Sequence, residues 1–197
     1  DPDAVQEYVA NWDKFDETAK QMKDAGYFML SGYDDAYRTF SNNVSAPWVN
    51  DKNEIVVDEN IMRWVDQTKT YTDNGYNNKN SLWSDGWAAD QGPDGKVFGF
   101  FYSTWGINFT LVGNAGEAGW GDWAVCYGPQ SYYWGGTWLC AGYQTDNKTL
   151  VHDIMYNMTC NADVMTPITT TPGVEDYTNN MAAMEAVANS DFKSDFL

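Results

Sequence analysis

The residues of this sequence that could do chemistry are aromatic side chains placed among glycines and short polar residues. Residues 95–102 have the apolar character of a buried strand, and a polar turn, Ser103-Thr104, then leads to Trp105 at the start of a helix. The carboxyl end of a strand is where open α/β sheets place small-molecule ligands. Trp105 is therefore the strongest candidate for contact with a ligand. The alternative is a core tryptophan at the junction of a strand and a helix.

A second aromatic group surrounds the glycine pair Gly135-Gly136. Glycine has no Cβ, so a ligand can approach the backbone closely at these positions. We predict that one of the surrounding aromatic residues faces a ligand while the others pack, with Trp134 as the first candidate and Tyr133 as the second. The group consists of Tyr132, Tyr133, Trp134 and Trp138.

Two further tryptophans, Trp83 and Trp87, are four residues apart in a polar segment. If that segment is helical, the two side chains share one face. Packing in the core is the simpler interpretation of both residues. Contact with a ligand is the alternative that we keep for them.

Acidic side chains follow the short apolar stretch 27–30, which we expect to be a buried strand. Tyr33, Asp34 and Asp35 lie in the polar loop directly after it. Carboxylates accept strong hydrogen bonds from ligand hydroxyl groups, so these three residues are candidate ligand contacts. The alternative is a solvated turn in which an aspartate caps a helix.

The sequence contains no pattern typical of a catalytic or metal centre. His152 is the only histidine, and no base or nucleophile can be grouped with it, so we interpret it as a solvated residue. Residues 90–95 resemble a cation-binding loop, but they lack the alternating acids and the closing glutamate of such loops. We therefore expect no catalytic residues, no metal site and no cofactor.

Composition narrows the function further. The chain has 197 residues, which fits one domain or parts of two, and its net charge of −17 repels nucleic acid and anionic lipid. That charge suits a neutral or cationic ligand and a soluble extracellular protein. There is no transmembrane stretch and no signal peptide, and neither end has the features of a natural terminus, so we expect a piece of a longer protein.

The three cysteines, Cys126, Cys140 and Cys160, are an odd number, which argues against a disulfide framework. We interpret them as buried small apolar side chains. A single disulfide, such as Cys126 to Cys140, is the alternative.

Periodicity and turn residues predict helices that alternate with strands, and hence an α/β fold. Asp58 is a plausible N-cap, and Gly26 and the pair Asn74-Gly75 are expected to end helices. The expected helices begin at Trp12 and Asp58 and near Trp105, and include 147–160 and 175–188; the expected strands are 27–30, 96–102, 122–127 and 137–143.

The order of these pieces resembles the extracellular solute-binding proteins of bacterial ABC sugar importers, of the family 1, maltose-binding-protein-like type. The matching motifs run from residue 12 to the end of the chain, and they are specific in their order rather than in any single match. They are Trp12-Asp13-Lys14-Phe15, the strand and turn of 95–106, the segment 122–129, the turn Gly135-Gly136-Thr137-Trp138 and the helix start Asn147-Lys148.

The resemblance implies a periplasmic-binding-protein-like lobe, in which a mixed sheet is flanked by helices. Residues 1–136 would form most of the second lobe of a two-lobe protein. Residues 137–197 would form a crossing strand and helices that return toward the missing first lobe. It also implies that Trp105 stacks on a sugar ring, and that the loop of Tyr33, Asp34 and Asp35 meets the ligand.

The implied function is binding of a mono- or oligosaccharide, without chemistry, and its delivery to the permease of an ABC transporter. The expected partners are the sugar, the permease subunits, the missing first lobe and a second copy of the fragment. The expected location is extracellular or periplasmic, with a membrane anchor outside this chain. Two alternatives remain: a secreted glycoside hydrolase fragment, with Asp34 and Asp85 as conceivable carboxylates, and a stand-alone carbohydrate-binding module.

Overall fold

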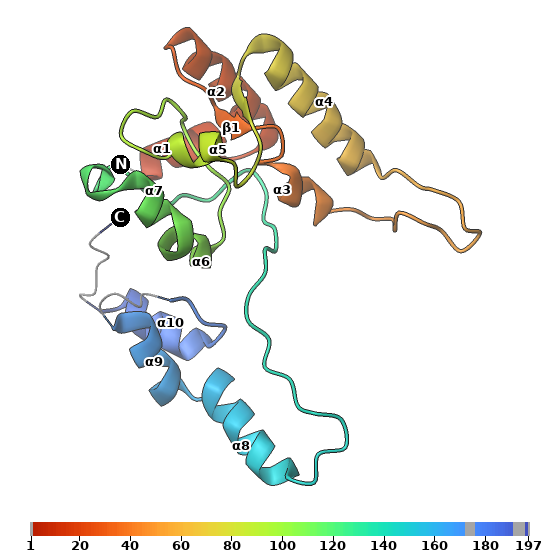
Figure 1. Cartoon of the computed structure of the whole chain (residues 1–197), viewed down its shortest axis with the longest axis vertical. Helices are drawn as coiled ribbons and strands as arrows, with labels where there is room; N and C mark the ends of the chain where they lie inside the picture. The colour runs from red at the N-terminus through yellow and green to blue at the C-terminus, as the bar shows by residue number, and fades with distance from the viewer. Residues whose placement is uncertain (1, 172–175, 191–195, 197) are drawn as a thin grey trace.

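The computed structural model describes residues 2–171, 176–190 and 196. The elements fall into two groups joined by a long extended segment (Figure 1). The first group holds the helices α1 to α7 with both strands, and the second holds α8 to α10. The candidate ligand residues all belong to the first group and to the beginning of the extended segment.

Two helices open the chain and supply much of the core. α1 spans Pro2–Val9, and α2 spans Trp12–Asp24, where Asn11 caps the first turn by accepting a hydrogen bond from the backbone N–H of Lys14. The helix expected to begin at Trp12 is confirmed, and its Trp12 and Phe15 side chains are buried. Gly26 ends this region with φ 87°, a left-handed conformation that favours glycine.

The sheet is small. β1 (Leu30–Gly32) pairs in parallel with β2 (Asn77–Asn80). An isolated parallel bridge joins Phe28, just before β1, to Val97 in a third segment. The α/β class is confirmed, although the described residues form a two-stranded parallel sheet rather than a larger mixed one. The rest of the predicted strand 96–102 is extended chain without a ladder partner in the described part.

A long arm separates α3 (Tyr37–Ser41) from α4 (Glu59–Asn74) and projects away from the body (Figure 1). Asp58 anchors the base of the arm. Its Oδ2 accepts hydrogen bonds from the backbone and hydroxyl of Ser45 and from the backbone N–H of Ala46, while its Oδ1 caps α4. Gly75 ends α4 in the left-handed conformation, as the sequence predicts.

The main core is aromatic. Trp12 stacks on Phe40 with ring centres 4.3 Å apart, and Phe101 packs against both Trp12 and Phe15. A fully buried aromatic side chain contributes about 2–3 kcal/mol of transfer free energy. This core fixes α3 and the end of segment 96–101 relative to α2, which determines where the neighbouring polar loops lie.

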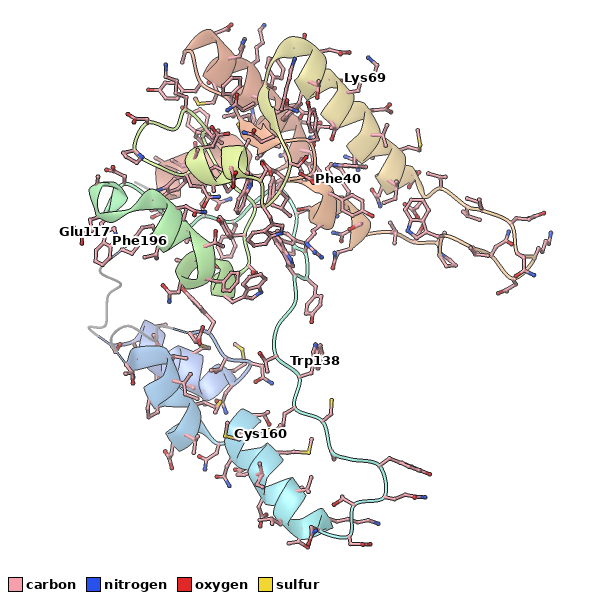
Figure 2. The ribbon with its side chains drawn as sticks, viewed as in Figure 1. Phe40, Lys69, Glu117, Trp138, Cys160 and Phe196 are labelled. Atoms are coloured by element: carbon pink, nitrogen blue, oxygen red, sulfur yellow. The ribbon has the colours of Figure 1, made fainter. Side chains whose placement is uncertain are left out.

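The part of the chain around Trp105 is more helical than the sequence predicts. Five short helical segments lie between residues 85 and 119, where we expected a helix to begin near Trp105. They are α5 (Asp85–Ala89), α6 (Thr104–Gly106), the π-helix η1 (Ile107–Leu111), α7 (Val112–Ala115) and η2 (Glu117–Gly119). Leu111 and Ala115 form a second small core with Phe196, whose side chain lies beside this group of helices (Figure 2).

The extended segment from residue 122 to residue 147 carries no strand within the described chain, although we predicted strands at 122–127 and 137–143. Both stretches have the extended conformation but not the hydrogen-bonded neighbours that define a strand. At Tyr127 a side chain takes the place of a neighbouring strand: Gln6 donates one hydrogen bond to the Tyr127 backbone oxygen and accepts one from its N–H. The cysteines are free, as predicted, but all three are exposed rather than buried.

The second group consists of α8 (Lys148–Thr159), α9 (Ala162–Thr170) and α10 (Met181–Ala188). The predicted helix 147–160 is confirmed. The predicted helix 175–188 begins later than expected, with residue 175 outside the described residues, and α9 was not predicted. No residue of α8 is buried, so its apolar stripe of Leu150, Ile154 and Met158 is exposed. None of the described helices is long and apolar enough to cross a membrane.

Candidate ligand-binding site

Five aromatic residues from three separate parts of the chain meet in one group, here called the aromatic cluster. Trp83 lies at its centre, with its ring nearly parallel to that of Trp105 (11°, centres 6.5 Å apart) and edge-on to Trp134 (6.0 Å). The cluster consists of Trp83, Trp87, Trp105, Phe109 and Trp134. The structure therefore brings together all four tryptophans that the sequence nominates.

Trp105 stands at the start of α6 and is half-buried. Its indole Nε1 donates a hydrogen bond of 2.8 Å to the backbone oxygen of Trp134, and the two rings meet at 77°. Gly135 follows with φ 72°, and a Cβ built there would lie 3.5 Å from the Trp105 nitrogen. Glycine is favoured at this position by its left-handed conformation, whereas a Cβ would make only an ordinary van der Waals contact with Trp105.

Trp83 is held in an unusual backbone conformation. Its φ of 67° lies in the left-handed region, where a bulky residue is an outlier that costs about 1–3 kcal/mol. The helix α5 begins only after Ser84, whose hydroxyl accepts from the backbone N–H of Trp87. The premise that Trp83 and Trp87 share a helical face is thus wrong, yet their rings still contact each other (5.0 Å). The turn presents 47% of Trp83 to solvent.

Trp87 and Asp35 were candidate ligand contacts, but the structure places both beneath the surface. Trp87 is 1% exposed, because the rings of Trp83 and Phe100 pack on it. Asp35 is 4% exposed. Burial raises the pKa of the Asp35 carboxyl from its usual 3.8 to about 6, an increase that the hydrogen bond from the Gly32 backbone reduces. These two residues support the cluster from below rather than offering a surface to a ligand.

The other members of the acidic loop are more accessible. Tyr33 is exposed, and its backbone oxygen accepts from the hydroxyl of Thr68. Asp34 is half-buried, and its Oδ1 accepts a hydrogen bond of 2.8 Å from the backbone N–H of Leu82, the residue before Trp83. Asp34 therefore ties the acidic loop to the residue before Trp83, and no described group donates to its second oxygen.

Helix α3 positions the aromatic segment 131–134. Asn43 donates to the Ser131 oxygen, and Asn42 accepts from the Tyr133 backbone N–H. Between these contacts the Tyr132 hydroxyl donates to the backbone oxygen of Tyr102, and the Tyr132 ring packs on Phe101. Tyr132 is therefore a packing residue of this group.

The remaining two members of that group point differently. Tyr133 is exposed, and its hydroxyl accepts a hydrogen bond from the indole of Trp138, which lies farther along the extended segment (Figure 2). Trp138 contacts no member of the aromatic cluster among the described ring pairs. Trp134, the first candidate of this group, is the one that joins the cluster.

Two residues of the site were missed in the sequence. Phe109 is 75% exposed and packs edge-on against Trp83 and Trp105. Its spacing of four residues from Trp105 was a usable signal, because such pairs lie on one side of a helix. Arg38 lies with its guanidinium carbon 4.6 Å from the centre of the Trp134 ring. No local sequence pattern predicts the contact between Arg38 and Trp134, since it joins segments far apart in the chain.

The other candidates lie outside this site. His152 is solvated on α8, as predicted, and its ring lies beside the carboxylate of its neighbour Asp153. The Asp90 carboxylate accepts hydrogen bonds from Ser31, Asn78 and Asn80, so it serves to connect the loops beside the sheet. Within the described residues, no three histidine, cysteine or acidic side chains are grouped so that they could hold a metal ion.

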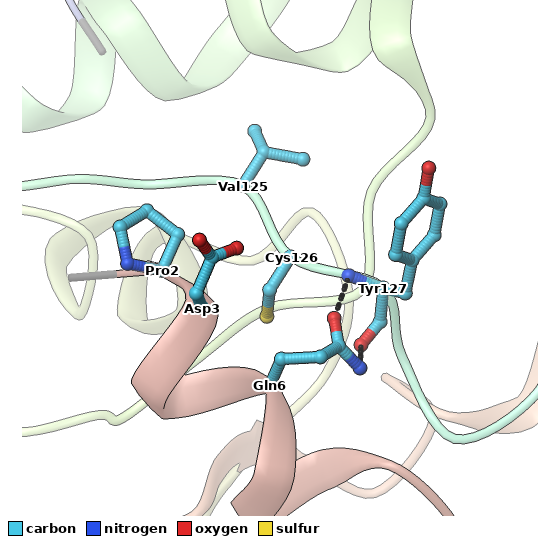
Figure 3. Close-up of a pocket in the computed structure, with 6 residues that line it drawn as sticks. All are labelled: Pro2, Asp3, Gln6, Val125, Cys126 and Tyr127. Carbon is cyan, nitrogen blue, oxygen red and sulfur yellow. Dashed lines mark hydrogen bonds between the residues drawn. The ribbon is translucent and has the colours of Figure 1, made fainter.

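A pocket of about 280 Å³ is found elsewhere, between α1 and residues 125–127 (Figure 3). Gln6 and Tyr127 close one side of it through their two hydrogen bonds. It includes no aromatic-cluster residue, and Tyr127 is its one aromatic side chain. The pocket is therefore separate from the candidate ligand-binding site.

Comparisons with known proteins address the fold. No family model matches the sequence, and no curated protein matches it. The structure is similar to a crystal structure of an extracellular solute-binding protein of family 1, with a TM-score of 0.73 and 18% sequence identity over 90% of this chain. The match covers 46% of that protein, so the chain spans about half its length. The resemblance seen in the sequence motifs is confirmed at the level of the fold.

Proposed function

We propose that this chain is the larger part of the second lobe of a solute-binding protein that binds a carbohydrate and delivers it to the permease of an ABC transporter. The observation that carries this proposal is the aromatic cluster, in which Trp83, Trp105 and Trp134 meet beside the polar loop of Tyr33 and Asp34. Indole faces fit the C–H faces of sugar rings, and carboxylates accept hydrogen bonds from their hydroxyl groups.

Local backbone geometry supports a ligand site at the cluster. Trp83 has a strained left-handed conformation, and the residues after Trp105 form the π-helix η1. Strained residues and π-helical turns both occur frequently at functional sites. The surrounding structure maintains this geometry, which a core with no binding role does not need.

The proposal includes the two-lobe organisation. Residues 1–136 form the second-lobe portion, and residues 137–197 include the crossing segment and the helices that return toward the first lobe. In this view the first lobe supplies the neighbours that the extended segment and α8 lack. The exposed side chains of Val125, Leu139, Leu150 and Ile154 are consistent with such a partner. The protein would act outside the cell or in the periplasm, held by an anchor beyond this chain.

A thermal-shift and calorimetry screen of the full-length protein against a library of mono- and oligosaccharides tests the function. Saturable binding of at least one saccharide, weakened by substitution of Trp105, is the expected result. A panel of aryl glycosides tests the hydrolase alternative, in which Asp34 and Asp85 would be the carboxylates. Turnover of any of these substrates would replace the binding-protein proposal with an enzyme.

A further inference from the structure

Arg38 is a cation with no acidic partner among the described residues of a chain rich in acids. Acidic residues outnumber lysine and arginine by 28 to 11. The ion pairs among the described residues use lysines and the histidine, and none uses Arg38. Its side chain is exposed, and no hydrogen bond from its guanidinium occurs in the described part of the chain. An arginine that remains unpaired among so many carboxylates has its hydrogen-bonding capacity available for another group.

The position of Arg38 is specific. Its guanidinium lies over the Trp134 ring, and that ring packs edge-on against Trp83 at 6.0 Å and Trp105 at 5.9 Å. A guanidinium that lies over an indole ring and makes no hydrogen bond in the described chain still has N–H groups to offer to a ligand. Arg38 therefore adds a cationic edge with unused donors to the aromatic cluster.

We propose that Arg38 selects an anionic carbohydrate, one whose sugar ring carries a carboxylate, as in a uronic acid. This inference rests on the carbohydrate-binding function proposed above and names the ligand class of the same site. A planar carboxylate matches the guanidinium edge with two parallel hydrogen bonds, which a hydroxyl group does not. The sugar ring stacks on the exposed aromatic faces, and Asp34 accepts from its hydroxyl groups.

From the net charge of −17 we expected a neutral or cationic ligand. The positive charge of Arg38 would favour an anionic ligand at this one position. Salt screens the distant charges over about 8 Å at physiological ionic strength, whereas a direct contact with Arg38 is screened much less. An acidic protein that binds an anion needs a fixed cation at the point of contact. Arg38 is that cation in the aromatic cluster.

A purely structural role for Arg38 would be to hold segment 131–134 in place. Two hydrogen bonds already attach that segment to the end of α3: Asn42 accepts one from the Tyr133 backbone N–H, and Asn43 donates one to the Ser131 oxygen. Removing the Arg38 charge should thus leave the Trp134 backbone where it is. Binding of a neutral sugar by an Arg38 variant reports on this point directly.

The test compares trisaccharides of galacturonic, glucuronic, mannuronic and guluronic acid with their carboxyl-reduced forms by calorimetry on the full-length protein. At least one acid should bind roughly 10- to 100-fold more tightly than its reduced form, the range for hydrogen bonds between charged groups. Arg38→Gln should remove this difference, because it should weaken binding of the acid far more than binding of the reduced form. Arg38→Lys, which keeps the charge but loses the planar fork, should retain part of it.

Arg63→Gln is the matched control, because Arg63 also lies over an aromatic ring, that of Phe40, but outside the aromatic cluster. Reduced forms that bind as tightly as the acids, or a preference that survives Arg38→Gln, would overturn the proposal and leave carbohydrate binding intact. Stronger binding of sulfated trisaccharides than of the acids would also overturn it. Absence of binding to any saccharide would overturn the proposed function as well.

Discussion

The indole nitrogen of Trp105 donates a hydrogen bond to the backbone oxygen of Trp134 at 2.8 Å. This bond joins the start of α6 to the segment before the glycine pair, and it sets the two rings at 77°. Trp105 thus has two separable functions. Its ring is a candidate stacking surface, and its N–H positions a second candidate.

Substitution of Trp105 separates these functions. Trp105→Ala should weaken saccharide binding by the full-length protein by about 1–3 kcal/mol, because it removes an aromatic contact. Trp105→Phe keeps a ring but loses the N–H, so we expect a smaller loss of about 1 kcal/mol. Calorimetry measures both, with Trp48→Ala as the control, since Trp48 is an exposed tryptophan on the arm. Unchanged affinity in Trp105→Ala would move the site elsewhere.

Trp83 offers a test of strain against function. Both Trp83→Ala and Trp83→Gly should reduce saccharide affinity, since each removes the ring at the centre of the cluster. Alanine keeps a Cβ at φ 67°, whereas glycine adopts this conformation freely. The free energy of unfolding of the glycine variant should therefore exceed that of the alanine variant by about 1 kcal/mol, as measured by denaturant unfolding. Equal stability of the two variants would contradict the strained conformation.

The buried carboxyl of Asp35 predicts a pH dependence of stability. Its pKa is raised to about 6 in the folded chain, from 3.8, so the folded state binds more protons than the unfolded state between these values. The folded chain should therefore become more stable as the pH falls from 7.5 through 6 to 4.5. A shift of this size corresponds to about 3 kcal/mol at most.

Urea unfolding of the wild type and of Asp35→Asn across this pH range isolates the contribution. The asparagine variant has no charge to bury, so its stability should rise less as the pH falls. The pKa of the Asp58 carboxyl is lowered, mainly by its hydrogen bond from the Asn60 backbone. Protonation of Asp58 should therefore destabilise the folded chain, but only at more acidic pH. Parallel pH profiles for the two proteins would show that Asp35 titrates normally.

The exposed cysteines should react without denaturant. Thiol titration of the chain should count about three groups, because Cys126, Cys140 and Cys160 are free and exposed. Cys126 should react most slowly at neutral pH, since partial desolvation of its thiol raises the pKa of this otherwise exposed residue, and the thiolate is the reactive form. A count near one would reveal a disulfide, with Cys126 and Cys140 as the first pair to examine.

The exposed stripe of α8 predicts self-association of the chain without its first lobe. Light scattering should show dimers or larger species, because Leu150, Ile154 and Met158 present apolar side chains to solvent. Replacing these three residues by serine should restore a monomer. The full-length protein should be monomeric before any substitution. A monomeric chain with micromolar saccharide affinity would contradict the two-lobe proposal.

Much of the local structure was determined by the sequence, where a few neighbouring residues decide the conformation. The helices α2 and α4 have a cap, an apolar stripe and a glycine end within one short segment, and both were predicted. The short α9 was missed, and the strands predicted at 122–127 and 137–143 did not form. A strand requires a hydrogen-bonded neighbour from elsewhere in the chain, which no local pattern supplies.

The candidate site shows the same division. Residue types nominated the tryptophans, but Trp87 and Asp35 were nominated with them and lie buried, because the depth of a side chain depends on what packs over it. Only the tertiary structure brought Trp83, Trp105 and Trp134 into one cluster and set Arg38 on its edge. These contacts join distant segments of the chain, and it is the packing of the aromatic core that decides which distant segments meet.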